Sequence, residues 1–105
     1  MIMELPETKQ VNEAGVLCGV MKAIGHPERL AIFRYLAEKK ATATVKEIYQ
    51  FLNLEQPVVS RQLGILKNNS VVIRETTKGN VFYRVNSSSP LIIGMIKCLF
   101  HTPVC

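Results

Sequence analysis

The chain of 105 residues contains no Asp and no Trp, and it has only two His and three Cys. Without Asp, a Ser-His-Asp triad for nucleophilic catalysis cannot be assembled. His and acidic residues are also too few for the metal site of a hydrolase, and the chain has no glycine-rich loop that would cradle a phosphate. The sequence therefore predicts a protein that is not an enzyme and that needs no cofactor.

Long apolar runs and a disulfide framework are missing as well. The longest apolar stretch, residues 91–100, is interrupted by Lys97 and is shorter than the roughly 20 residues that a membrane span needs. Residues 1–6 lack the positive region and apolar run of a signal peptide. An odd number of cysteines without framework spacing favours free thiols in a reducing compartment. We therefore expect a cytoplasmic protein that does not engage a membrane.

Positive charge is concentrated in the second half of the chain. The composition, with 48% hydrophobic and 20% charged residues, is ordinary for a globular protein, and the length fits one domain over residues 1–105. Residues 1–56 hold seven basic residues and seven Glu, whereas residues 57–105 hold six basic residues and one Glu. The whole net charge of +5 therefore lies in the second half. Such a surface favours a polyanion as partner, either nucleic acid or membrane headgroups.

Hydrophobic periodicity and turn residues predict four helices, a β-hairpin and a last helix. The period changes from helical to alternating after residue 70. We expect Thr44 and Glu47 to form a capping box, and Glu55 or Gln56 to cap the fourth helix. The expected helices cover about 8–23, 27–38, 45–53, 57–68 and 91–100, and the expected strands cover 71–76 and 81–85.

Apolar stripes indicate which helix faces should be buried. In the fourth helix, Val59, Leu63 and Leu66 recur at i, i+4 and i+7 and should point inward. His26 is expected to cap the second helix or to lie on the surface. In the hairpin turn, Gly79 or Asn80 is available for a positive φ. The stripes expected in the first two helices are Val11, Ala14, Leu17, Cys18 and Met21, and then Leu30, Phe33, Leu36 and Ala37.

Two short helices joined by a tight turn and followed by a basic hairpin form a winged helix-turn-helix, an α+β and mainly α-helical fold. The second helix of such a unit lies in the major groove of DNA and presents its N-terminal side chains to the base edges. Gln pairs bidentately with adenine and Arg with guanine, while basic residues of the hairpin can lie along phosphates. The candidate DNA contacts are Gln56, Pro57, Ser60, Arg61 and Gln62 in the helix, and Arg74, Lys78 and Arg84 in the hairpin.

Three segments in this order resemble the ArsR/SmtB family of repressors. Residues 23–36 (AIGHPERLAIFRYL) are similar to the family's opening pattern ALGDPTRLRILxLL. Residues 54–66 (LEQPVVSRQLGIL) resemble its recognition segment LSQSTVSRHLKVL, and residues 78–85 (KGNVFYRV) resemble its wing, REGRxVYYRL. The resemblance implies a dimeric transcriptional repressor that binds double-stranded DNA. It also implies that Gln56, Pro57, Ser60 and Arg61 meet the DNA, in agreement with the face derived above.

The chain departs from the family pattern at positions close to the expected DNA. Glu55 stands where the family has a Ser cap. Its carboxylate interacts favourably with the positive end of the helix dipole but repels phosphate. The usual Lys is Gly64, which loses a phosphate contact and about 1 kcal/mol of helix propensity. The Gly that usually precedes the wing is Asn69 or Ser70. These departures bear on affinity for an operator more than on the fold.

The metal sites that are common in the ArsR/SmtB family are not expected in this chain. Residues 45–49 contain no Cys, and the last-helix zinc site of the family uses Asp, which the chain lacks. The spacing of Cys98, His101 and Cys105 could hold zinc or copper(I), although we favour a small apolar role for Cys98 and a frayed tail. A thiol switch is a further alternative, because Cys18 and Cys98 fall on the two helices that form the dimer contact in the family.

The last helix is apolar nearly all round, so part of its surface must be covered by another molecule. We expect a homodimer through the first and last helices, which would read a near-palindromic operator. The alternative interpretation, a helix that lies in a membrane interface, is less well supported, because Lys97 is the only residue of its polar face. The alternative function is a winged-helix module for protein interaction with little operator affinity, which Glu55 and Gly64 keep open.

Overall fold

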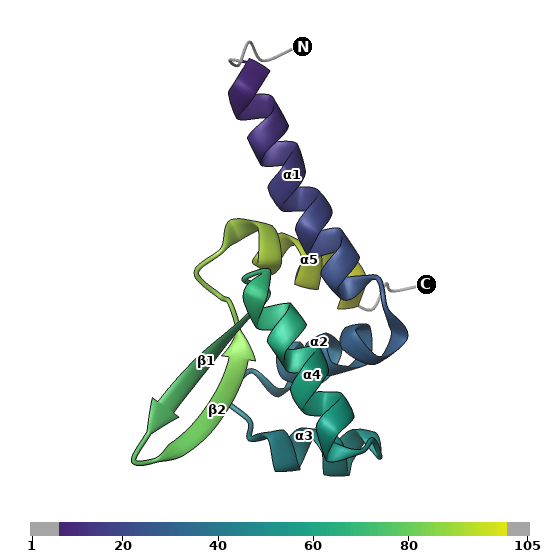
Figure 1. Ribbon diagram of the computed structural model, residues 1–105, viewed down its shortest axis with the longest axis vertical. Coiled ribbons are helices and arrows are strands. Elements are labelled where there is room, and N and C mark those ends of the chain that lie inside the picture. The colour runs from purple at the N-terminus through teal and green to yellow at the C-terminus, as the bar shows by residue number, and fades with distance from the viewer. Residues whose placement is uncertain (1–6, 101–105) are drawn as a thin grey trace.

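The computed structural model describes residues 7–100, with side chains from residue 14 onward, and contains the elements in the predicted order. Helices α1 to α4 precede a two-stranded antiparallel hairpin, and α5 follows it (Figure 1). The prediction of a mainly α-helical winged helix-turn-helix is confirmed. The elements are α1 Glu7–Ile24, α2 Pro27–Lys39, α3 Val45–Leu52, α4 Gln56–Asn68, β1 Val72–Thr77, β2 Asn80–Val85 and α5 Pro90–Phe100.

Side-chain caps fix the starts of α2 and α3. His26 is the N-cap of α2, and its Nδ1 accepts a hydrogen bond from the Glu28 amide at 3.2 Å. The Thr44 hydroxyl accepts from the Glu47 amide at 3.1 Å, and the Glu47 carboxylate accepts from the Thr44 amide at 2.8 Å. The capping box is therefore confirmed, as is the capping role of His26. The Thr44 hydrogen bond lowers the pKa of the Glu47 carboxyl below its ordinary value.

The start of α4 differs from the prediction. Glu55 occupies the N-cap position but makes no side-chain capping hydrogen bond, and Gln56 is the first helical residue, so neither side chain caps this helix. Pro57 still lies in the first turn, where its missing N–H costs nothing. The amides that precede Val59 in this turn therefore receive no side-chain cap.

The hairpin is closed by a two-residue turn in which Lys78 and Gly79 have φ of 51° and 80°. The expected alternative, Asn80, instead pairs with Thr77 as the first residue of β2. Two consecutive positive φ values match the right-handed twist of the strands, which explains the two-residue connection. Lys78 is thereby placed at the tip.

Two further backbone features complete the wing. Ser70, not Asn69, takes the left-handed conformation before β1, with φ of 59°. Ala43, expected in a plain connector, forms an isolated bridge with Tyr83, whose two backbone hydrogen bonds measure 2.8 and 2.9 Å. The bridge ties the base of the hairpin to the segment that enters α3.

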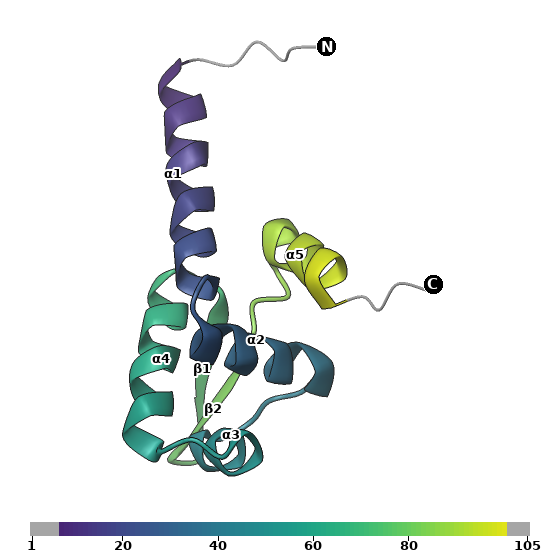
Figure 2. The same ribbon diagram turned by 90° about the vertical axis from the view of Figure 1, so that its right-hand side faces the viewer.

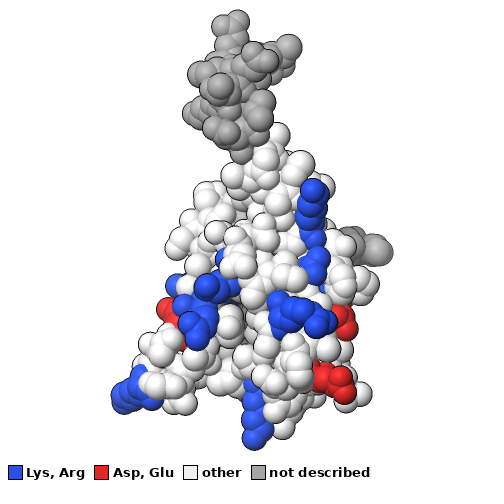
Figure 3. All heavy atoms as spheres, in the orientation of Figure 1, with Lys and Arg blue, Asp and Glu red and all other residues white. Residues whose placement is uncertain are grey.

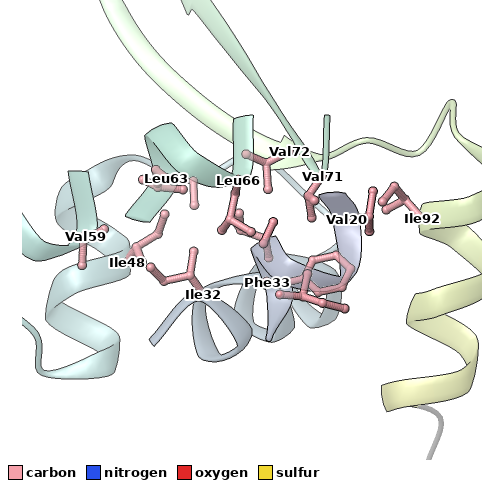
Figure 4. Packing of buried hydrophobic residues seen from close by; sticks show 14 residues of the cluster. Val20, Ile32, Phe33, Ile48, Val59, Leu63, Leu66, Val71, Val72 and Ile92 are labelled. Atoms are coloured by element: carbon pink, nitrogen blue, oxygen red, sulfur yellow. The ribbon is translucent and has the colours of Figure 1, made fainter. Parts of the chain in front are cut away.

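The hydrophobic core extends through all helices of the described part (Figure 4). Val59 and Ile48 lie at the end formed by α3 and α4, while Val20 and Ile92 lie where α1 and α5 meet the body. The inward prediction for Val59 and the two leucines of α4 is confirmed, since all three are fully buried. The largest fully buried side chains are Phe33, Ile32, Leu36, Ile48, Leu63, Leu66, Ile92, Val59, Val71 and Val72.

Two of the predicted apolar stripes are only partly buried within the chain. In α1 the buried side chains are Val20, Ala23 and Ile24, whereas Leu17, Cys18 and Met21 of the expected stripe are exposed. Val11 lies outside the described side chains, and Ala14 is exposed. In α2 Leu30 is exposed and Ile32 is buried in its place. The described residues of the predicted α1 stripe thus lie on an exposed face of the helix, and a different face of α1 packs against the core.

The two ends of the molecule carry different elements. The start of α4 and the tip of the hairpin lie at one end in both views, and α1 projects from the body toward the opposite end (Figures 1 and 2). Helix α5 packs against α2, where the ring centroids of Phe100 and Phe33 are 5.3 Å apart. The described residues contain no helix long and apolar enough to cross a membrane.

Candidate nucleic-acid interface

Helices α3 and α4 are joined by a tight turn that exposes the first turn of α4. Asn53 ends α3 in the left-handed conformation with φ of 56°, and the Leu54 amide donates to the Tyr49 carbonyl at 3.0 Å. Leu54 packs against the core, so the chain re-enters the body before α4 begins. This turn sets the direction in which α4 leaves the core.

The predicted face of α4 is open to solvent at its N-terminal end. Gln56, Pro57 and Arg61 are exposed, and Ser60 is half-buried. The Gln56 amide nitrogen donates to the Ser60 hydroxyl at 2.9 Å. This bond uses one of two amide hydrogens and leaves the other hydrogen and the carbonyl oxygen, which is the pair that adenine recognition requires.

Gln62, expected among the DNA contacts, points the other way. Its side chain is 4% exposed, and both ends of its amide are used inside the subunit. Oε1 accepts from Arg29 at 2.9 Å, and Nε2 donates to Glu28 at 3.1 Å. The structure therefore does not place Gln62 on the exposed face with the other candidate residues of α4, because both polar groups of its side chain are hydrogen-bonded inside the protein.

The inward placement of Gln62 had a visible signal in the sequence. Gln62 follows Val59 by three residues and precedes Leu66 by four, so it belongs to the buried stripe of α4. Its partners, however, lie 33 and 34 positions earlier in the chain. No sequence pattern joined the three residues.

The basic residues of the hairpin differ in availability. Arg74 pairs in register with Tyr83, and Arg84 pairs with Ile73, so the two arginines lie on opposite faces of the hairpin. Arg84 forms an ion pair with Glu75 at 3.1 Å and is half-buried. Arg74 and Lys78 are exposed, and neither takes part in an ion pair within the described side chains. Lys78 and Arg74 are therefore the freer cations.

The charged groups on the surface over α4 and the hairpin are mostly basic (Figure 3). Lys and Arg groups cover several parts of this face, including the hairpin tip, and Asp or Glu groups are few. The acidic exception in the segment itself is Glu55, which is exposed and lacks a capping bond. Glu75 is already paired with Arg84. Net positive charge thus accompanies the exposed N-terminal turn of α4.

The two thiol candidates lie on α1 and α5, away from the start of α4. Cys18 and Cys98 are free and exposed. Of the weak metal set, Cys98 alone is described, since His101 and Cys105 lie outside the described residues. Residues 7–100 contain no group of three His, Cys, Asp or Glu that could hold a metal ion.

Comparison with known proteins agrees with this geometry. A helix-turn-helix domain model matches residues 24–74. The biofilm growth-associated repressor of Xylella fastidiosa is 30% identical over 80 residues, which cover 76% of this chain and 66% of the relative. The HTH-type transcriptional repressor SmtB of Mycobacterium tuberculosis is 35% identical over 80 residues, 76% of this chain and 56% of the relative. The chain thus spans little more than half of the latter.

A solved structure covers more of the chain. The transcriptional repressor PagR of Bacillus anthracis is 30% identical, with a TM-score of 0.71, over 90% of this chain and 99% of that one. The similarity therefore extends through the hairpin and the flanking helices, beyond the matched domain model. Its recognition helix, its wing and its kinship with these proteins place the chain in the ArsR/SmtB family of winged helix-turn-helix transcriptional repressors.

Proposed function

We propose that this protein represses transcription as a homodimer, with one α4 helix in each of two successive major grooves of a near-palindromic operator. The exposed first turn of α4 carries the proposal. Gln56 in this turn, with Ser60 and Arg61 in the next, offers hydrogen bonds of the kind that read base edges. Pro57 lies on the same turn as Gln56 and provides an apolar contact surface.

The hairpin supports α4 by contacting the phosphate backbone. Lys78 at its tip is exposed, and the tip lies at the same end of the molecule as the start of α4 (Figures 1 and 2). Arg74 is available on one face of β1, whereas Arg84 contributes less because Glu75 neutralises it. Contacts of this kind hold the protein in register without reading sequence.

The apolar surface of α1 and α5 supports the homodimer. Val16, Leu17 and Met21 of α1 are 63%, 41% and 54% exposed, and Leu99 of α5 is 49% exposed. An open apolar hollow of about 390 Å³ lies along α5, lined by Pro90, Leu91, Gly94, Met95, Cys98 and Leu99. Exposed apolar surface of this extent needs a partner, and a second copy supplies a matching one.

A direct test combines the mass of the free protein with binding to duplex DNA. Light scattering at micromolar concentration should give twice 11.8 kDa. Duplexes selected by the protein from a random pool should be near-palindromic, and their affinity should fall steeply with salt because several phosphates are contacted. A monomeric mass, or a pool without enrichment, would contradict the proposal and favour a protein-interaction module.

A thiol-responsive version of the same function has one observation in its favour. Cys18 and Cys98 are both exposed, and they lie on the two helices that carry the exposed apolar residues. Treatment with diamide should abolish operator binding if these thiols form a switch. The same loss in a Cys18→Ser variant would remove Cys18 from it.

A further inference from the structure

A polar network inside the subunit joins three helices. Arg29 of α2 donates from Nη1 to Gln62 Oε1 of α4 at 2.9 Å, and Gln62 donates to Glu28 of α2 at 3.1 Å. Arg29 also donates to the carbonyls of Ala23 and Lys22 in the last turn of α1. One guanidinium therefore connects the end of α1 to the middle of α4.

Gln62 occupies a position that an apolar residue could fill. It is the one buried polar side chain among those that the structure describes, and it lies beside Leu63 in the buried stripe. A buried amide contributes little net stability even when its hydrogen bonds are satisfied, whereas each directional bond restricts geometry. The network is therefore better suited to orienting α4 than to stabilising the fold.

A second contact links the same two helices. A Cβ added at Gly19 of α1 would lie 3.0 Å from the side-chain oxygen of Asn69, which ends α4. Helix α1 thus meets α4 near its C-terminal end at Gly19, and the Arg29 bridge connects it to the middle at Gln62. The close approach at Gly19 and the hydrogen-bonded bridge at Gln62 lie at separate places along α4, so together they constrain its direction relative to α1.

The bridge from Arg29 connects a helix with an exposed apolar face, α1, to the helix that carries the candidate DNA contacts, α4. Met21, one residue before Lys22, belongs to the exposed apolar face of α1, and Arg61, one residue before Gln62, belongs to the exposed face of α4. In the proposed dimer, a change in how α1 packs would move the carbonyls that accept from Arg29, and the guanidinium would pass the movement on to Gln62.

We infer that Gln62 is a positioning residue, which with Arg29 and Glu28 sets the orientation of the recognition helix relative to the dimer helix α1. It touches no DNA and determines how accurately Arg61 reaches the bases. The inference rests on the proposed function for its DNA readout, although the orientation of the helices can be measured without DNA.

Three variants separate orientation from stability. Gln62→Met keeps size and removes the hydrogen bonds. Gln62→Glu keeps the shape but sets two carboxylates against each other. The double variant Glu28→Gln with Gln62→Glu restores every bond, because the carboxylate now at position 62 accepts from Arg29 and from the amide now at position 28. Glu28→Gln alone is the control for the loss of the acidic group.

The first readout is the ratio of affinities for a duplex selected by the wild-type protein and for a scrambled duplex. We expect Gln62→Met and Gln62→Glu to lower this ratio at least tenfold, with the melting temperature of Gln62→Met close to that of the wild type. The double variant should recover most of the ratio. A ratio unchanged in both single variants, or one that the double variant does not recover, would overturn the inference.

The second readout is independent of DNA. Residual dipolar couplings of backbone amides in the free protein report the angle between α1 and α4. This angle should change in Gln62→Met and return in the double variant. An unchanged angle would refute the positioning role even if the wild-type protein selected no duplex, whereas failure of selection with a changed angle would refute the proposed function alone.

Discussion

The two ends of this small protein expose opposite kinds of surface. The α4 and hairpin end presents cations without ion pairs, such as Arg61 and Lys78, while the α1 and α5 end presents apolar side chains such as Met21 and Leu99. Attraction between charges weakens with added salt, whereas burial of apolar surface does not. Added salt should therefore release DNA from the α4 and hairpin end, while the second subunit should stay bound at the α1 and α5 end.

The largest effect is expected from a charge placed at the apolar end. Leu99→Glu would bury a carboxylate between subunits, which costs about 3 kcal/mol or more and weakens dimerisation about 100-fold. Sedimentation at micromolar concentration should then give a monomer. Operator affinity should fall as well, because each subunit would contact one half-site alone.

Leu30→Glu is the matched control for this substitution. Leu30 is 38% exposed and Leu99 is 49% exposed, so the two changes are similar in character. Leu30 lies on α2, which is not one of the two helices of the proposed interface, and its variant should remain a dimer. Dissociation of both variants would show that any added charge dissociates the protein, and the comparison between the two ends would lose its meaning.

At the charged end the largest effect should come from Arg61. Arg61→Ala should lower affinity for the selected duplex by about 1–3 kcal/mol and relax the preference at one base position. Lys67→Ala, in the last turn of the same helix, removes the same charge and should leave base preference unchanged. Equal losses on selected and scrambled duplexes in Arg61→Ala would refute its role in base reading.

Lys78 should have a smaller and sequence-independent effect. Lys78→Ala should weaken binding to all duplexes alike and reduce the slope of log K against log salt by about 0.9, the contribution of one phosphate contact. Lys97→Ala at the apolar end controls for net charge and should leave the slope unchanged. If the two variants reduced the slope equally, overall charge and not the hairpin tip would be responsible.

The sequence was informative wherever the signal was local. The capping box at Thr44, the helix start at Pro27 and the hairpin turn are set by residues within a few positions of one another, and each was found. The positive φ at Lys78 was missed because Lys rarely adopts it, and here the two-residue turn required it.

Contacts distant along the chain were beyond the reach of sequence patterns. The spacing of Gln62 placed it in the buried stripe of α4, but its partners Arg29 and Glu28 lie 33 and 34 positions earlier, so no sequence pattern predicted the network. Similarly, the ion pair between Glu75 and Arg84 depends on strand register and distinguishes Arg84 from Arg74. The apolar stripe on α1 was recognised, but its periodicity did not distinguish burial in the subunit's own core from exposure to a partner.

Glu55 is the acidic exception at the charged end, and replacing it should produce a small gain. Its carboxylate is exposed at the start of α4, caps no amide and would lie near phosphate in the proposed complex. Glu55→Gln and Glu55→Ser should both raise DNA affinity by less than about tenfold, since the removed repulsion is between exposed charges and is screened by salt. The gain should shrink as salt is added.

The two variants of Glu55 should differ in stability. Ser at an N-cap accepts a hydrogen bond from the helix amides, which is worth about 0.5–2 kcal/mol, whereas Gln removes the favourable interaction of the carboxylate with the helix dipole and supplies no good cap. Denaturant unfolding should therefore rank Glu55→Ser above Glu55→Gln, with wild type between them or close to Ser. If DNA affinity rose only in the more stable variant, a better-formed α4 helix would explain the gain in affinity, and the loss of repulsion from phosphate would not. Equal gains at unequal stability would instead place Glu55 beside the phosphates, at the same end as Arg61 and Lys78.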